Sequence, residues 1–72
     1  MAYVIQRGNQ FTPCIDVNDV KDKLESWFDV NAPINADNPN LTYGEAINVL
    51  IKCLREKSYV GRVAGLLGIR IS

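Results

Sequence analysis

The segment LTYGEAINVLIKCLREK, residues 41–57, carries the strongest helical pattern of the 72-residue chain. Its apolar side chains recur at the spacing of one helical face, and the central stripe consists of Ile47, Leu50, Ile51 and Leu54. Thr42 and Glu45 have the T-x-x-E spacing of a capping box, which satisfies free N–H groups of the first turn. The pattern predicts a helix over residues 42–57. Because the apolar arc is wide, we expect this helix to be central and to contact two other helices and a sheet.

A second helical pattern precedes the first, over residues 16–29. One face carries Val17, Val20, Leu24, Trp27 and Phe28. Asp16 is a favourable N-cap residue, and Ile15 and Val20 occupy the two positions of a hydrophobic staple. We therefore expect a helix that begins at Asp16, with Ile15 folded back onto Val20.

A third pattern covers residues 58–68, with Val60, Val63, Ala64 and Leu67 on one face. Ser58 is the expected cap. Gly68 fits the left-handed position that ends a helix, after which Ile69 returns to the core. Gly61 and Gly65 lie inside the pattern, where each glycine is about 1 kcal/mol less favourable than alanine. Two interpretations remain open: a close crossing with another helix of this domain, or a flat docking face for a partner's backbone or strand.

The remaining segments predict short strands and a loop. Residues 1–12 are expected to form a β-element, a strand or a hairpin over residues 2–7 and 10–12, because Gly8-Asn9 favours a turn and Pro13 limits the second strand to an edge or its end. Residues 31–41 are expected to be a loop, since two prolines and four asparagines fall within residues 31–40. The tail, residues 69–72, alternates apolar and polar residues and could pair with the N-terminal strand. The predicted fold class is α+β, one small domain over residues 1–72.

Charge is balanced overall but not along the chain. The formal net charge is zero, whereas nucleic-acid-binding proteins usually carry a basic excess. Residues 1–37 hold three basic and six acidic side chains, and residues 38–72 hold five basic and two acidic ones. The two halves either neutralise each other across the fold or give a basic face for an acidic partner.

The residue types for most catalytic and metal sites are missing. The chain has no histidine, which removes the usual general base and zinc ligand. Its two cysteines, Cys14 and Cys53, form no CxxC pair, and the glycines do not have phosphate-binding spacing. We therefore expect no catalytic site, no metal, no cofactor and no enzymatic activity.

Two further expectations concern the compartment. Two cysteines are weak evidence for a disulfide framework, so we expect both thiols to be reduced and buried in a cytoplasmic protein. The longest apolar run is too short to span a bilayer, so no membrane partner is expected.

Residues 60–69, VGRVAGLLGI, resemble the Fis-type helix-turn-helix pattern, which reads roughly AAxLLGI before its turn. The matching residues are Ala64, Leu66, Leu67, Gly68 and Ile69, with Val63 where the first alanine often stands. The resemblance implies a nucleic-acid-binding regulator whose next helix enters the major groove. Only Arg70, Ile71 and Ser72 follow here, so the helix over residues 42–57 is the remaining candidate for such contacts.

These observations predict a small non-enzymatic regulator that binds a larger protein partner as an inhibitor, adaptor or assembly factor. Small size suggests phage-encoded proteins as one common source. The alternative is a dimeric nucleic-acid-binding transcriptional regulator, and a homodimer also remains open. The expected partner-binding residues are polar ones outside the apolar stripes: Arg7, Asn9, Gln10, Lys52, Arg55, Lys57, Arg62 and Arg70.

Overall fold

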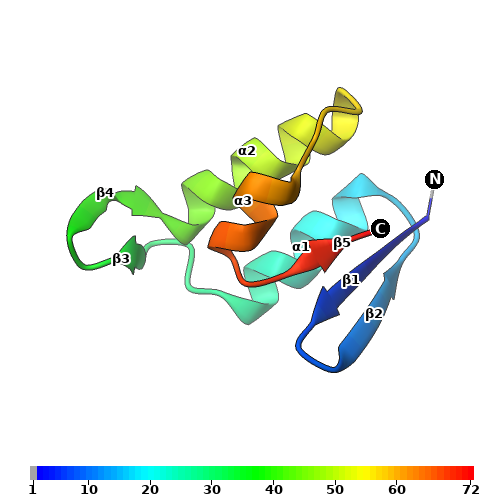
Figure 1. Cartoon of the computed structure of the whole chain (residues 1–72), viewed down its shortest axis with the longest axis horizontal. Coiled ribbons are helices and arrows are strands. Elements are labelled where there is room, and N and C mark those ends of the chain that lie inside the picture. Colours follow the sequence, from blue (N-terminus) through cyan, green and yellow to red (C-terminus); the bar gives the residue numbers. More distant parts are fainter. Residues whose placement is uncertain (1) are drawn as a thin grey trace.

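A computed structural model describes residues 2–72, so Met1 of the predicted β-element lies outside the described residues. The elements along the chain are β1 (Tyr3–Arg7), β2 (Gln10–Cys14), α1 (Val17–Trp27), β3 (Pro33–Asn35), β4 (Asn38–Thr42), α2 (Tyr43–Arg55), α3 (Gly61–Leu66) and β5 (Arg70–Ile71). The helices lie on one side of a sheet that joins the two ends of the chain (Figure 1). The predicted α+β domain is confirmed, with its N-terminal hairpin, three helices and C-terminal strand.

The three-stranded sheet has the order β2-β1-β5, and both pairings are antiparallel. Ile5, in the middle strand, lies opposite Ile71 of β5 and is fully buried. The strand β2 extends to Cys14, beyond the predicted end at residue 12. Pro13 is tolerated there because β2 is an edge strand, where a missing N–H leaves no ladder bond unmade. The tail pairs with β1 as predicted.

The core lies between the helices and the inner face of this sheet. The helix α2 contributes most of it, with Ala46, Ile47, Leu50, Ile51 and Leu54 buried. This helix packs on α1 and α3 as expected, but its strand contacts are mainly with β4, while the three-stranded sheet is contacted mainly by α1 and α3. The helix α2 is therefore central among the helices rather than the main cover of that sheet.

The predicted N-caps, Asp16 and Thr42, are confirmed, but among the described residues the Glu45 side chain makes no return bond that would complete the capping box. The Asp16 Oδ1 atom accepts from the Asp19 N–H at 2.8 Å, and the Asp19 carboxylate accepts from the Ile15 N–H at 3.1 Å. The Thr42 hydroxyl accepts from the Glu45 N–H at 3.2 Å. The staple prediction is wrong, because the Ile15 side chain is 77% exposed. Ile15 contributes to the start of α1 through its backbone N–H, which donates to Asp19, and not through its side chain.

The predicted loop over residues 31–41 instead contains a hairpin of β3 and β4 (Figure 1). The Asn35 side chain accepts from the Asp37 N–H at 3.0 Å, which closes the turn. The pairing is irregular and joins Pro33 to Thr42 and Asn35 to Asn38. Two prolines are compatible with such a two-stranded sheet, since both of its strands are edges.

The helices are shorter than predicted, α3 most clearly. Ser58 does not cap it, because α3 begins at Gly61 and its N-cap position, Val60, makes no side-chain cap bond. The Ser58 N–H is instead donated to the Cys53 carbonyl at 2.8 Å, completing the end of α2. The end of α3 is as predicted: Gly68 has a φ of +68° and Ile69 is buried.

Candidate functional site

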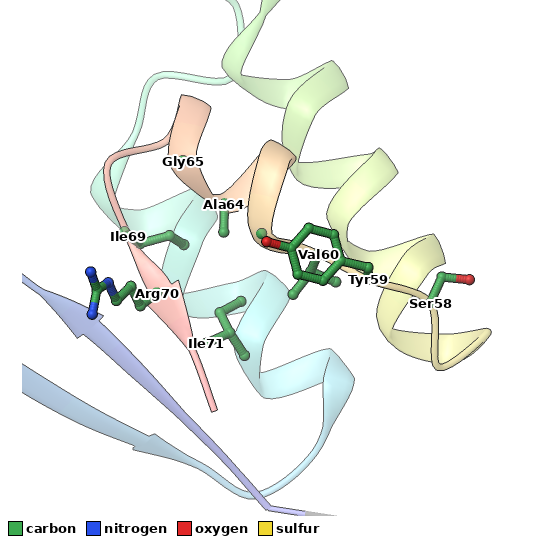
Figure 2. Close-up of a pocket in the computed structure, with 9 residues that line it drawn as sticks. Ser58, Tyr59, Val60, Ala64, Gly65, Ile69, Arg70 and Ile71 are labelled. Carbon is green, nitrogen blue, oxygen red and sulfur yellow. The ribbon is translucent and has the colours of Figure 1, made fainter.

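A hollow of about 610 Å³ opens between α3 and β5. One wall is formed by residues 58–61 with Ala64 and Gly65, and the other by residues 69–71. Figure 2 shows Ala64 and Ile69 at its base and the Tyr59 ring across the start of α3. Because Ala64 and Ile69 belong to the buried core, the base of the hollow is apolar and rigid.

A second hollow of about 270 Å³ continues the first toward the β1–β2 turn. It shares Gly65, Ile69 and Arg70 with the first hollow and adds Gln6, Gly8 and Gly68. We call the two together the α3–β5 groove. The strand β5 lies beside α3 and is paired with β1, so the sheet forms one side of this groove.

Tyr59 forms the rim of the groove. Its side chain is 84% exposed, the largest fraction among the exposed large apolar residues. The ring lies directly over Gly61, so that a Cβ atom at Gly61 would collide with it. Most of the ring is in solvent, and the absence of a Cβ atom at Gly61 leaves room for it at the start of α3.

Gly65 does not have the role expected from a close helix crossing. A Cβ atom built there meets no heavy atom within 4 Å, and the residue is exposed on the groove side of α3. The interpretation in which Gly61 and Gly65 let α3 cross another helix is therefore wrong. Gly61 faces Tyr59 of its own segment, and Gly65 faces open space.

The charge around the groove is positive. Among the described residues that line it, none carries a carboxylate, and Arg70 lines both hollows. Residues 57–72 contain Lys57, Arg62 and Arg70 and no acidic side chain. A groove with this surrounding charge favours an acidic ligand over a basic one.

All eight predicted partner-binding residues are exposed, but they do not form one patch. The turn that holds Asn9 and Gln10 and the end of α2 that holds Arg55 and Lys57 lie on opposite sides of the molecule (Figure 1). Of the eight, only Arg70 lines the groove. Exposure alone therefore selected residues from several surfaces.

Two of these arginines have partners inside the chain. The Arg7 guanidinium lies 5.5 Å from the centre of the Trp27 ring and 5.1 Å from that of Phe28. The Phe28 ring in turn stacks on Tyr43, at 4.9 Å between centroids. Arg55 donates to the Asn18 side chain at 3.1 Å, which links α2 to α1. Both arginines contribute to packing within the domain.

The chemistry of other candidate groups is limited. Both cysteines are free; Cys14 is buried and Cys53 is half-buried. Burial raises the pKa of the Cys14 thiol, with the Asp19 carboxylate adding to the effect, so this thiol is a poor nucleophile. Within residues 2–72, no cluster of three or more acidic or cysteine side chains could hold a metal ion. None of the helices described is long and apolar enough to cross a bilayer.

Tyr59 and the backbone of Ile71 were not predicted as parts of a site, and Gly65 was considered only in the open interpretation of a docking face. The only signal in the sequence was the pair of glycines, Gly61 and Gly65, inside a helical pattern that disfavours them.

Comparisons with protein-family models, with curated proteins and with solved structures found no match for this chain.

Proposed function

We propose that this protein is a small non-enzymatic regulator that acts by binding a larger protein through the α3–β5 groove. The observation that carries the proposal is Gly65, an exposed helical glycine that opens onto the groove and whose Cβ, if added, would meet no atom of the described residues within 4 Å. Glycine at such a position weakens a helix by about 1 kcal/mol relative to alanine. A partner whose backbone approaches α3 closely accounts for a glycine that the fold itself does not need.

The composition of the groove supports a protein partner. Its rim carries a tyrosine and an arginine, Tyr59 and Arg70, which are residue types enriched at the centres of protein interfaces. Its base, Ala64 and Ile69, is apolar and already ordered, so binding there orders few additional side chains. An inhibitor, an adaptor and an assembly factor would all use such a surface, and two free cysteines fit action in the cytoplasm.

The test is quantitative capture of partners from the native host by the tagged full chain, followed by binding measurements with the purified partner. Tyr59→Ala is the test variant, and Phe11→Ala is its control, because Phe11 is also an exposed aromatic residue but lies on the opposite sheet edge. We expect Tyr59→Ala to weaken binding by about tenfold or more, the effect of a hot-spot aromatic residue. We expect Phe11→Ala to bind as the wild type does.

Equal binding by both variants would place the interface elsewhere. A nucleic-acid function predicts a different outcome: retardation of DNA or RNA in gels that falls steeply with salt. That retardation should weaken with alanine at Lys52, the exposed lysine of α2. A salt-dependent change in sedimentation of the chain alone would instead indicate self-association.

A further inference from the structure

Within residues 2–72, the strand β5 has an edge that pairs with no other strand. Val4 and Ser72 exchange both of their backbone hydrogen bonds, Val4 N–H to Ser72 O at 2.9 Å and Ser72 N–H to Val4 O at 3.0 Å. In an antiparallel ladder the next pair along, Ile5 and Ile71, does not exchange such bonds. The Ile71 N–H and C=O therefore point away from β1, at the outer edge of the sheet.

This edge faces the groove. Figure 2 shows β1 on one side of β5, and Tyr59 with the start of α3 on the other. Ile71 itself lines the larger hollow. A sheet edge that runs beside a helix, with an apolar hollow between the two, matches the geometry by which extended peptides add a strand to a domain.

Gly65 removes the side chain that would obstruct such a strand on the helix side. A Cβ atom there would point into space that no other atom of the chain occupies. On the same wall, the exposed Tyr59 ring lies beside Gly61 at the rim of the groove, where a bound segment would contact it. The groove thus offers backbone pairing on one wall and apolar contact on the other.

The charges select the kind of segment. Arg70 lies in the groove, Arg62 lies on α3, and none of the described lining residues is acidic. A basic segment would be repelled here, whereas aspartate or glutamate side chains beside Arg70 would be attracted.

We propose that the α3–β5 groove binds an extended acidic segment of a partner protein, which pairs with the free edge of β5 as a fourth strand of the sheet. This rests on the proposed function, since it specifies how the partner would be held. The segment alternates apolar and acidic residues: the apolar ones fill the hollow over Ala64 and Ile69, and the acidic ones lie toward Arg70. Its backbone exchanges hydrogen bonds with Ile71.

The experiment selects binders to the full chain from a display library of random twelve-residue peptides. We expect the enriched sequences to alternate acidic and apolar residues. The best peptide is then titrated into the isotope-labelled protein, where the largest amide shifts should occur at Gly65 and Ile71, with slowed hydrogen exchange at Ile71. Two versions of the peptide are N-methylated on alternate residues, one on the odd and one on the even positions. Because successive N–H groups of a strand point to opposite edges, only the version that loses the N–H groups facing β5 should bind at least about tenfold more weakly.

Two matched pairs of variants test whether the residues of the α3–β5 groove determine peptide affinity. Gly65→Leu fills the hollow with a good helix former and should lose at least about tenfold in peptide affinity, while Asn48→Leu, on the exposed side of α2, should lose none. Arg70→Glu should weaken the acidic peptide more than Lys52→Glu, which makes the same charge change outside the groove. Circular dichroism of each variant confirms that it is folded.

Several results would overturn the inference: no enriched peptide, a basic or helical consensus, amide shifts outside the groove, or equal affinity of both N-methylated versions. The proposed function fails separately. If capture from the host yields a partner that depends on Tyr59 but no peptide binds, the groove binds a folded surface rather than a strand. If peptides bind but no host protein is captured through Tyr59, the regulatory role is refuted and the peptide site remains.

Discussion

Replacing Gly65 by alanine should stabilise the protein. The substitution adds one methyl group at an exposed helical position where the structure offers open space within 4 Å, and the backbone of Gly65 is not at positive φ. Alanine also has fewer conformations to lose on folding, and such changes contribute about 0.4–1 kcal/mol. For a domain of 60–100 residues this raises the unfolding temperature by about 2–8 °C. Urea unfolding followed by circular dichroism should give a higher midpoint with an unchanged slope.

Gly68 provides the control, because it also has open space but its φ is +68°. Gly68→Ala should destabilise the protein by about 1–2 kcal/mol, the strain of an alanine in the left-handed region. If Gly65→Ala leaves the midpoint unchanged or lowers it, the fold itself needs that glycine. The reasoning that assigns Gly65 to a partner would then be wrong.

Three other substitutions test the fold. Gly44→Ala should lower the free energy of unfolding by about 1–3 kcal/mol, because its Cβ would lie 2.8 Å from the Val30 carbonyl oxygen; urea unfolding that shows no loss would mean that this contact relaxes freely. Lys57→Gly should raise the free energy of unfolding by about 0.5–1 kcal/mol, since Lys57 follows the end of α2 with a φ of +57°. A lower urea midpoint for this variant would contradict the strain assigned to Lys57. Asp16→Ala should lower the free energy of unfolding by about 0.5–2 kcal/mol through loss of the N-cap, whereas Asp22→Ala on the exposed side of α1 should change it little.

The helices were predictable because their signals are local. Asp16, Thr42 and Gly68 each form the cap expected from their place beside an apolar stripe. Such bonds join residues three to five positions apart, so the sequence contains both partners. The predicted helix runs through Lys57, whereas α2 ends at Arg55 and Lys57 has a left-handed backbone conformation. That conformation was not predicted, since a lysine at the left-handed position carries no signal of its own.

The hairpin over Pro33–Asn35 and Asn38–Thr42 could not be predicted from the same kind of pattern. Its strands are short and polar, so they show little of the apolar alternation that marks a half-buried strand. What stabilises it is a turn closed by one asparagine side chain and the contact of β4 with α2. The first is a weak signal in an asparagine-rich segment, and the second depends on the tertiary fold.

The α3–β5 groove was also not predictable from the sequence, because it too depends on the tertiary fold. Its walls, α3 and β5, are neighbours in sequence, but the space between them is set by the pairing of β5 with β1, about 65 residues away along the chain. The sequence correctly indicated exposed basic residues but not which of them share a surface. Only the glycines pointed to the site, and they did so as a departure from helix propensity rather than as a motif.

Three residues within positions 57–65 depart from what local stability favours. Lys57 takes a left-handed backbone conformation, Tyr59 leaves an aromatic ring largely in solvent, and Gly65 weakens a helix of only six residues. A small domain has a marginal core, so a folding requirement alone would favour replacing them. Tyr59 and Gly65 belong to one wall of the groove, and Lys57 precedes that wall in the chain. Residues that are unfavourable for local structure are expected where function constrains the sequence. If so, Lys57→Gly and Gly65→Ala together should raise the free energy of unfolding more than either alone, while Gly65→Ala, which adds a methyl group at the groove, should weaken partner binding.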